Sequence, residues 1–169
     1  MTTVAHNPYV APRAALEDAR ESFQAVRVFS VSGRIGRARY ILYTMGLPML
    51  IMLPAAFVSG FLGQAGVAVL AVAWVVMVVL SFMLTIQRSH DFNMSGWFSL
   101  LWLVPLANFA FWFIPGTDGP NRFGARTPPN GTGVLVGVWI VPLIFVMGIA
   151  AAVAIPAYQD YVKRTEQRR

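Results

Sequence analysis

Three long stretches of the chain contain no Asp, Glu, Lys or Arg, and most of their positions are apolar. They cover residues 40–87, 92–117 and 127–159, with lengths of 48, 26 and 33 residues. A helix that crosses a bilayer needs about 20 apolar residues, so the first stretch suits two such helices and the others one each. Glycines within 59–66 mark a turn inside the first stretch. The pattern therefore predicts four transmembrane helices, at 41–62, 67–86, 97–114 and 134–157.

The composition agrees with an all-α, polytopic membrane protein. Hydrophobic residues make up 57% of the 169 residues and charged residues only 12%, whereas an average soluble domain has about 25% charged residues. A soluble globular enzyme and a disordered chain are therefore excluded as first interpretations. The absence of cysteine excludes disulfides, thiolate metal sites and cysteine nucleophiles. We divide the chain into an N-terminal arm at 1–28, a core with the first three spans at 29–126, and a last span with a basic tail at 127–169.

Basic residues are distributed unevenly between the predicted loops. The first 40 residues carry six arginines, the second loop carries Arg88 and the tail carries four basic residues, whereas the loop after Pro115 carries two. Cytoplasmic loops are enriched in Lys and Arg, so four spans place both termini in the cytoplasm, with eleven basic residues inside and two outside. The net charge of +6 then favours anionic lipid headgroups as partners and not nucleic acid.

The third predicted span leaves an alternative open. It is short and contains Pro105 and Asn108, which interrupt its apolar pattern. If this segment enters the membrane and returns on the same side, the loop after Pro115 becomes cytoplasmic and the tail lies outside. The basic residues then number nine inside and four outside, a weaker bias in the same direction. In either arrangement we expect the Asn108 side chain to hydrogen-bond to a neighbouring helix.

A first polar cluster lies immediately before the first span. It contains Arg34, Arg37 and Arg39, followed by Tyr40 at the edge of the apolar stretch. Guanidinium groups at this level can bind lipid phosphates, and tyrosine suits the interfacial region. The alternative is that these arginines only fix the topology.

A second polar cluster, between the second and third spans, contains Arg88, His90 and Asp91. One His beside one Asp is at most half of a metal site, so we predict no metal, no cofactor and no catalysis there. We expect Asp91 to pair instead with an arginine of the first cluster. Such a pair at the headgroup boundary is partly screened, which predicts a contribution of about 1 kcal/mol or less. Trp97, at the start of the third span, is predicted to lie at the membrane interface.

The third cluster is the loop at 115–124, whose Gly, Pro, Asn and Asp residues favour tight turns. Within it, Asp118 and Arg122 are a candidate ion pair. In order and spacing, over about 29–124, the three clusters resemble the bacterial domain of unknown function 805 family. The resemblance implies a small protein of the bacterial inner membrane and no particular activity.

That family has a Gly-Arg-x-x-Arg-x-x-Tyr type of motif before its first span, then Arg-Arg-Leu-His-Asp followed by Ser-Gly-Trp-Trp. It ends with a Pro-Gly-Thr-x-Gly-x-Asn-Arg-Tyr/Phe-Gly loop. The positions that carry the resemblance are Gly33, Arg34, Tyr40, Arg88, His90, Asp91, Ser95, Gly96, Trp97, Asn121 and Arg122. This sequence departs from the family pattern at Gln87, Ser89 and Phe98.

The last predicted span carries a second resemblance. Residues 148–164, with their Ile-Pro-Ala-Tyr-Gln-Asp-Tyr run, are similar to the N-terminal helix of type IV pilins. Trp139 stands where pilins have a glutamate, and the prepilin cleavage residues and a pilin head are missing, so the chain is not expected to be a pilin. The resemblance implies pilin or a pilus assembly protein as a partner. Pilins run outward through this segment, a direction that this helix shares only if the third segment is re-entrant.

Among function classes, the sequence favours a structural or interaction protein over an enzyme, with an accessory role in type IV pilus assembly as one form of it. A small transporter or channel component is the alternative, although no predicted span contains an ionisable residue. The sequence does not determine an oligomeric state. The candidate structural or interaction residues are Arg34, Arg37, Arg39, Arg88, His90, Asp91, Trp97, Asn108, Asn121, Arg122, Gly148, Ala152, Pro156 and Tyr158.

Overall fold

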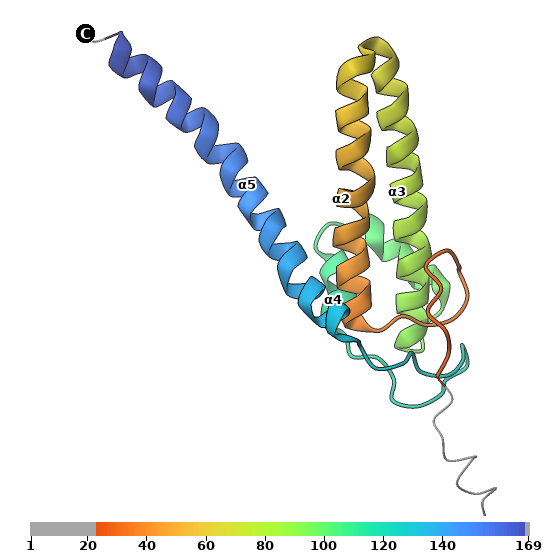
Figure 1. Ribbon diagram of the computed structural model, residues 1–169. Helices are drawn as coiled ribbons and strands as arrows, with labels where there is room; N and C mark the ends of the chain where they lie inside the picture. Colours follow the sequence, from red (N-terminus) through yellow and green to blue (C-terminus); the bar gives the residue numbers. More distant parts are fainter. Residues whose placement is uncertain (1–22, 168–169) are drawn as a thin grey trace, which may run out of the picture.

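The structure is a computed structural model that describes residues 23–167. Most of the predicted arm at 1–28 therefore lies outside the described residues. Within them the protein is built from helices, and only an isolated bridge between Asn121 and Gly124 is strand-like. This confirms the all-α fold class (Figure 1). The long helices are α2 (Arg37–Leu62), α3 (Gln64–Asp91) and α5 (Thr132–Glu166), and the short ones are η1 (Gly96–Leu103), η2 (Ala107–Phe109) and α4 (Ala110–Phe113).

Helices α2 and α3 form a long antiparallel hairpin. Each is long and apolar enough to cross a membrane, at about 39 and 42 Å from a rise of about 1.5 Å per residue. The connection between them is Gly63 alone, so the turn is tighter than the one expected at 59–66. Gly63 has a φ of 55°, in the region that favours glycine. Gly66 lies directly against the Ser59 carbonyl, where a side chain would collide.

The third predicted span is not a transmembrane helix. Residues 96–113 form three short helical pieces, and the segment begins and ends at the same end of α3. The Met94 amide donates to the Ser89 carbonyl at 2.9 Å, and the Thr117 amide donates to the Asp91 carbonyl at 2.8 Å. Between these ends the segment rises along α3 far enough for Trp102 to contact Phe82, with ring centroids 5.1 Å apart.

This segment is therefore a hairpin that returns to the end of α3 where it begins, which is the path that the re-entrant alternative requires, and we call it the re-entrant hairpin. Its tip lies between η1 and η2, where Pro105 cannot donate a backbone hydrogen bond and Leu106 has a φ of 68°. A continuous helix cannot pass through such a turn. Among the described residues three helices are long and apolar enough to span a membrane, and the predicted count of four is not confirmed.

Helix α5 starts beside the start of α2 and runs in the same direction. Gly137 lies against Leu42, and Gly46 of α2 lies close to Val141 one helical turn farther along. Apart from Val162, the half-buried positions of α5 lie in its first third, and the rest of the helix leans away from the hairpin (Figure 1). The C-terminal end of α5 therefore lies toward the turn between α2 and α3, at the opposite end from the loops.

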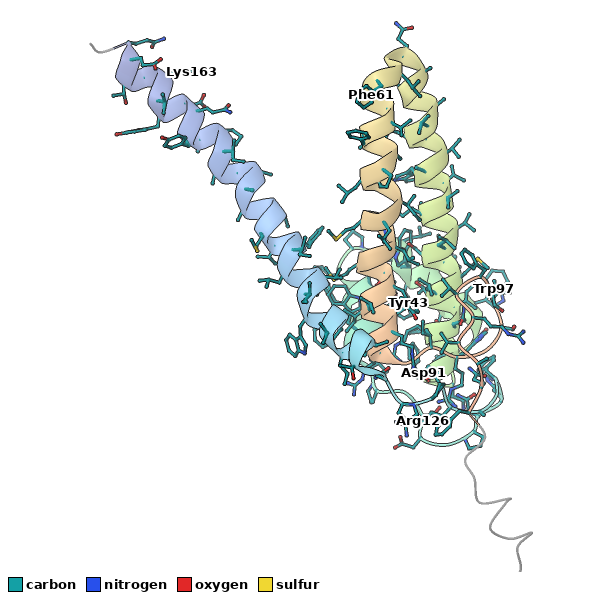
Figure 2. The ribbon with its side chains drawn as sticks, viewed as in Figure 1. Tyr43, Phe61, Asp91, Trp97, Arg126 and Lys163 are labelled. Carbon is teal, nitrogen blue, oxygen red and sulfur yellow. The ribbon has the colours of Figure 1, made fainter. Side chains whose placement is uncertain are left out.

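The core lies at one end of the helices. Its buried apolar members are Ile35, Tyr40, Leu84 and Phe111, which come from four different segments. The side chains buried most completely nevertheless include Arg34, Arg88 and Gln87. Figure 2 shows Asp91 and Arg126 at this end of the protein and Lys163 at the far end of α5. A polar cluster thus joins the loops beneath a largely exposed set of apolar helices.

Candidate functional site

The centre of the polar cluster is one carboxylate held between two guanidinium groups. The Asp91 carboxylate accepts from Arg34 at 3.1 and 3.2 Å through one oxygen, and Arg88 pairs with its other oxygen. Arg88 and Asp91 lie three residues apart on the last turn of α3, and so share one helix face. All three residues are at most 4% exposed. The expected pairing of Asp91 with an upstream arginine is confirmed, and Arg34 is that arginine.

The remaining donors of the two arginines bind backbone carbonyls of separate loops. Arg34 donates to the Thr117 carbonyl at 2.6 Å and to the Gly119 carbonyl at 2.7 Å. Arg88 donates to the Phe111 carbonyl at 2.8 Å. Because a guanidinium presents five donors in a planar fork, each arginine can satisfy several carbonyls at once. The cluster therefore fastens the N-terminal loop, α3 and the end of the re-entrant hairpin to one another.

His90 and Asn121 extend the cluster on its outer side. The His90 Nδ1 atom hydrogen-bonds with the Gly33 carbonyl at 3.0 Å, and its ring stacks on Phe123 with centroids 3.8 Å apart. The Asn121 amide nitrogen donates to the His90 carbonyl at 2.8 Å and to the Thr117 hydroxyl at 2.9 Å. Each of these residues is engaged in holding two of the three polar motifs together.

The described part of the chain that folds around this cluster matches a known family. Residues 28–125, more than half of the chain, match the family described as protein of unknown function (DUF805). The chain belongs to the DUF805 family. No curated protein and no solved structure was found to match it. The resemblance predicted from the three motifs is confirmed, whereas the resemblance of 148–164 to pilins lies outside the matched residues and stays a prediction.

Other arginines of the DUF805 motifs have different surroundings. Arg39 is 7% exposed and donates to the Pro128 and Pro129 carbonyls at 2.7 and 2.8 Å, which fastens the segment before α5 to the start of α2. Arg37, by contrast, is exposed. Arg122 donates to the Asn93 carbonyl at 2.9 Å.

The ion pair expected between Asp118 and Arg122 is not found. Asp118 pairs with Arg126 at 3.5 Å, and both side chains are largely exposed. The backbone explains the difference, because the bridge between Asn121 and Gly124 turns the loop back on itself. This turn brings Arg126, rather than the nearer arginine, alongside Asp118.

Two further side chains, those of Tyr40 and Gln87, make buried hydrogen bonds within the DUF805 core. The Tyr40 hydroxyl hydrogen-bonds with Thr85 at 3.1 Å and donates to the Asn108 side chain at 3.5 Å, so Asn108 reaches a neighbouring helix as expected. Sequence reasoning missed Gln87, which it treated only as a departure from the family pattern. Gln87 is 1% exposed and its amide donates to the Arg27 carbonyl at 2.9 Å. A polar residue in the last turn of an apolar helix was the available signal.

The other predicted residues lie apart from the cluster. Trp97 is 80% exposed at the start of η1. The remaining four are on the exposed part of α5, namely Gly148, Ala152, Pro156 and Tyr158. The structure therefore brings together the candidates from the three DUF805 motifs and leaves the pilin-like candidates separate.

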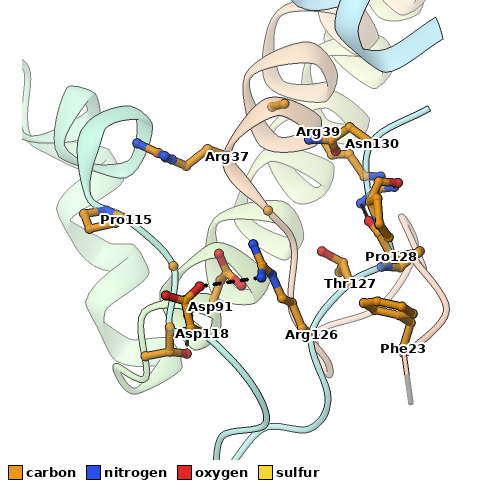
Figure 3. Close-up of a pocket in the computed structure, with 15 residues that line it drawn as sticks. Phe23, Arg37, Arg39, Asp91, Pro115, Asp118, Arg126, Thr127, Pro128 and Asn130 are labelled. Atoms are coloured by element: carbon orange, nitrogen blue, oxygen red, sulfur yellow. Dashed lines mark hydrogen bonds and ion pairs between the residues drawn. The ribbon is translucent and has the colours of Figure 1, made fainter. Parts of the chain in front are cut away.

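A pocket of about 540 Å³ opens beside the cluster, between the start of α2 and the loop that leads to α5 (Figure 3). Its lining includes Arg37, Asp91, Asp118, Arg126 and Thr127. Within residues 23–167, no group of three or more His, Asp or Glu side chains is placed to hold a metal ion. The lining carries charges of both signs, with Arg37, Arg39 and Arg126 beside the carboxylates of Asp91 and Asp118.

Proposed function

We propose that this DUF805 protein is an integral protein of the bacterial inner membrane that works as an interaction protein, without catalysis, by holding another transmembrane helix against α5. The observation that carries the proposal is the exposure of α5. Every residue from Leu143 to Tyr161 is exposed, although the helix is long and apolar enough to cross a membrane. In contrast, α2 and α3 pack against each other along their length.

The exposed part of α5 offers a surface suited to a second helix. Gly148 and Ala152 lie four residues apart on one face, and nothing lies within 4 Å of the position that a Gly148 side chain would take. Small residues at this spacing allow two helix backbones to approach closely in a membrane. The earlier glycine, Gly137, already packs against Leu42 of α2 within this chain. The first part of α5 thus serves for attachment, which leaves the second part for a partner.

Charge supports one orientation of this arrangement. With the polar cluster and its loops in the cytoplasm, nine basic residues lie inside and the four of the tail lie outside. In this orientation α5 runs outward and its C-terminus lies outside, rather than in the cytoplasm as four spans predicted. A pilin helix runs in the same direction, so α5 and a pilin would pack in parallel. This agreement supports pilin or a pilus assembly protein as the partner.

The proposal is tested by photocrosslinking in intact cells of a piliated host. A photocrosslinking amino acid at Ala151, beside the small-residue face, is expected to trap a membrane protein identifiable by mass spectrometry as pilin or a pilus assembly protein. The matched control is Val153, which is 67% exposed but lies about 140° around the helix from Gly148 at 3.6 residues per turn. Gly148→Leu is expected to abolish the adduct at Ala151.

Two outcomes would contradict the proposal. Equal trapping at Ala151 and Val153, or trapping that survives Gly148→Leu, would mean that α5 presents no specific face. If the trapped partner is specific but unrelated to pili, and deletion of the gene leaves piliation and twitching unchanged, the role in pilus assembly is rejected and only the interaction role stands. The transporter or channel alternative stays a prediction, since no contact in the described residues favours it.

A further inference from the structure

The segment that leads into α2 is held against α3 by Gln87. The Gln87 side-chain amide donates to the Arg27 carbonyl at 2.9 Å and also to the Ser30 carbonyl. The Gln87 carbonyl in turn accepts from the Ile35 amide at 3.3 Å. Figure 1 shows this segment, coloured red to orange, running up beside the lower part of α3 before it turns back toward α2. Residues 27–35, which we call the Gln87 loop, therefore lie alongside the last turns of α3 and not beyond its end.

The Gln87 loop turns apolar side chains away from the protein. Val28 packs against the buried core, but Phe29 is 79% exposed and Val31 is 55% exposed. Arg27 is exposed as well. A loop surrounded by water usually presents polar side chains, whereas large apolar ones close together mark a surface for a partner. The partner of this loop must match two apolar side chains beside a cation.

The tip of the loop satisfies polar groups of its own. The Ser32 amide donates to the Ser30 hydroxyl at 3.1 Å, and the hydroxyl oxygens of the two serines are 2.9 Å apart. The Ser30 carbonyl is one of the two that Gln87 binds. Polar groups that enter apolar surroundings need partners within the protein. The turn around Val31 thus pairs its serines with each other while it directs an apolar side chain outward.

The loop lies at the level where the apolar part of α3 meets the polar cluster. Gln87 is four residues before Asp91, which is about 6 Å along the helix toward its apolar part. Trp97 is 80% exposed at the start of the re-entrant hairpin, and Figure 2 places it closer to the apolar helices than Asp91 is. Tryptophan is enriched where a membrane meets water. If α2 and α3 cross the bilayer, the exposed side chains of the loop meet its headgroups and its outermost acyl region.

We propose that the Gln87 loop is a lipid-binding anchor, in which Phe29 and Val31 insert into the outermost hydrocarbon of the nearer leaflet and Arg27 binds its phosphate groups. Val28 of the loop and Phe98 of the re-entrant hairpin pack against the same core, so the loop lies next to an element whose exposed face is apolar. Apolar side chains beside basic ones are typical of segments that lie in the membrane interface. None of these residues belongs to α5, so this role does not depend on the helix partner proposed above.

The absence of cysteine from the chain makes a fluorescence test direct. The full chain is prepared with a single cysteine as Phe29→Cys, Leu50→Cys or Asp118→Cys, labelled with the environment-sensitive fluorophore NBD and reconstituted into vesicles of phosphatidylcholine and phosphatidylglycerol. Phosphatidylcholine that carries a nitroxide quencher, either near the headgroup or at the far end of the acyl chain, is then included. We expect the label at position 29 to emit at a shorter wavelength than the label at 118. It should lose more intensity to the shallow nitroxide than to the deep one.

The other two positions are the matched controls. Leu50 is 72% exposed midway along α2, so its label should be quenched more by the deep nitroxide. The Asp118 side chain is 94% exposed in the loop of the polar cluster, so its label should be quenched by neither, which also controls for insertion by the fluorophore itself. Since Phe29 is largely exposed, Phe29→Cys is expected to fold, and an unchanged unfolding midpoint in detergent verifies this.

Three results would overturn the proposal. One is quenching at position 29 no stronger than at 118. Another is emission at short wavelength without quenching by either lipid, because protein rather than lipid would then cover Phe29. The third is a label at position 50 that is unquenched as well, since the helices beside the loop would then lie outside the bilayer.

Discussion

Replacement of Asp91 by Asn tests whether the buried cluster holds the fold together. Asparagine preserves the size and most of the shape of the side chain but removes its negative charge. In the wild type this charge faces Arg34 at 3.1 Å and Arg88 on its other oxygen. After Asp91→Asn, two guanidinium groups that are almost fully buried would lie together without a counterion. Their mutual repulsion and their lost solvation both disfavour the folded state.

The expected loss follows from burial. Breaking a buried ion pair by removing one partner costs about 3–5 kcal/mol, whereas an exposed pair is worth about 0–1 kcal/mol. Since Asp91 is 4% exposed and both arginines at most 1%, the buried value applies. This corrects the loss of about 1 kcal/mol or less that the sequence predicted for a screened pair. At about 2–4 °C per kcal/mol, the unfolding midpoint should fall by about 6–20 °C.

The assay is thermal unfolding in detergent, with Asp118→Asn as the control. Asp118 also pairs with an arginine, but its side chain is 94% exposed, so its replacement should cost at most about 1 kcal/mol. A double-mutant cycle with Arg34→Gln should give a coupling of about 0.5–3 kcal/mol between Arg34 and Asp91. If Asp91→Asn is no more destabilising than Asp118→Asn, or if the two effects in the cycle are additive, the reasoning from burial is wrong.

Two other predictions concern the close packing of the loop and the topology. Gly116→Ala should destabilise the protein by about 1–3 kcal/mol in the same unfolding assay, because the new methyl group would overlap the Asp91 carboxylate. Gly60→Ala in α2 is the control: its methyl group meets nothing within 4 Å, so it should be neutral or stabilising. In this cysteine-free chain, Gln64→Cys and Gln167→Cys should both react with a membrane-impermeant thiol reagent in intact cells, whereas Asp118→Cys should not. Labelling at only one of positions 64 and 167 would refute the three-span arrangement.

The apolar pattern was sufficient to predict α2, α3 and α5, because a helix is the simplest way to satisfy backbone groups inside a bilayer. It was insufficient for the third segment. Residues 97–114 have the composition of a span, and what changes their path is Pro105 at the tip and the contacts that draw both ends back to Ser89 and Asp91. The contact of Thr117 with Asp91 joins two residues that are far apart in the sequence, so a local pattern does not encode it.

The site shows the same division between what is local and what is not. The motifs around Arg34 and Asp91 were recognisable, and their opposite charges were enough to predict a pair. The sequence did not indicate that Arg88 would share the same carboxylate, that Asp118 would choose Arg126, or that Gln87 would hold the loop at Arg27. Each of these depends on how deeply the loops are buried and on the turn at Asn121, which follow from the assembled fold.

The position of the cluster explains how the protein can hold its own helices together and still leave α5 available. Between helices in a membrane, lipid is as apolar as the side chains, so apolar contact alone does not select a partner. Within this chain, the polar cluster at the loops determines which segments pack together, because Arg34, Arg88 and Asp91 join four parts of the sequence. Within the described residues α5 is attached near its base, where Arg39 of α2 binds the Pro128 and Pro129 carbonyls just before α5, and where Gly137 and Val141 pack against Leu42 and Gly46 of α2. A helix that is held at its base and exposed from Leu143 to Tyr161 suits the proposed role of presenting α5 to another membrane protein.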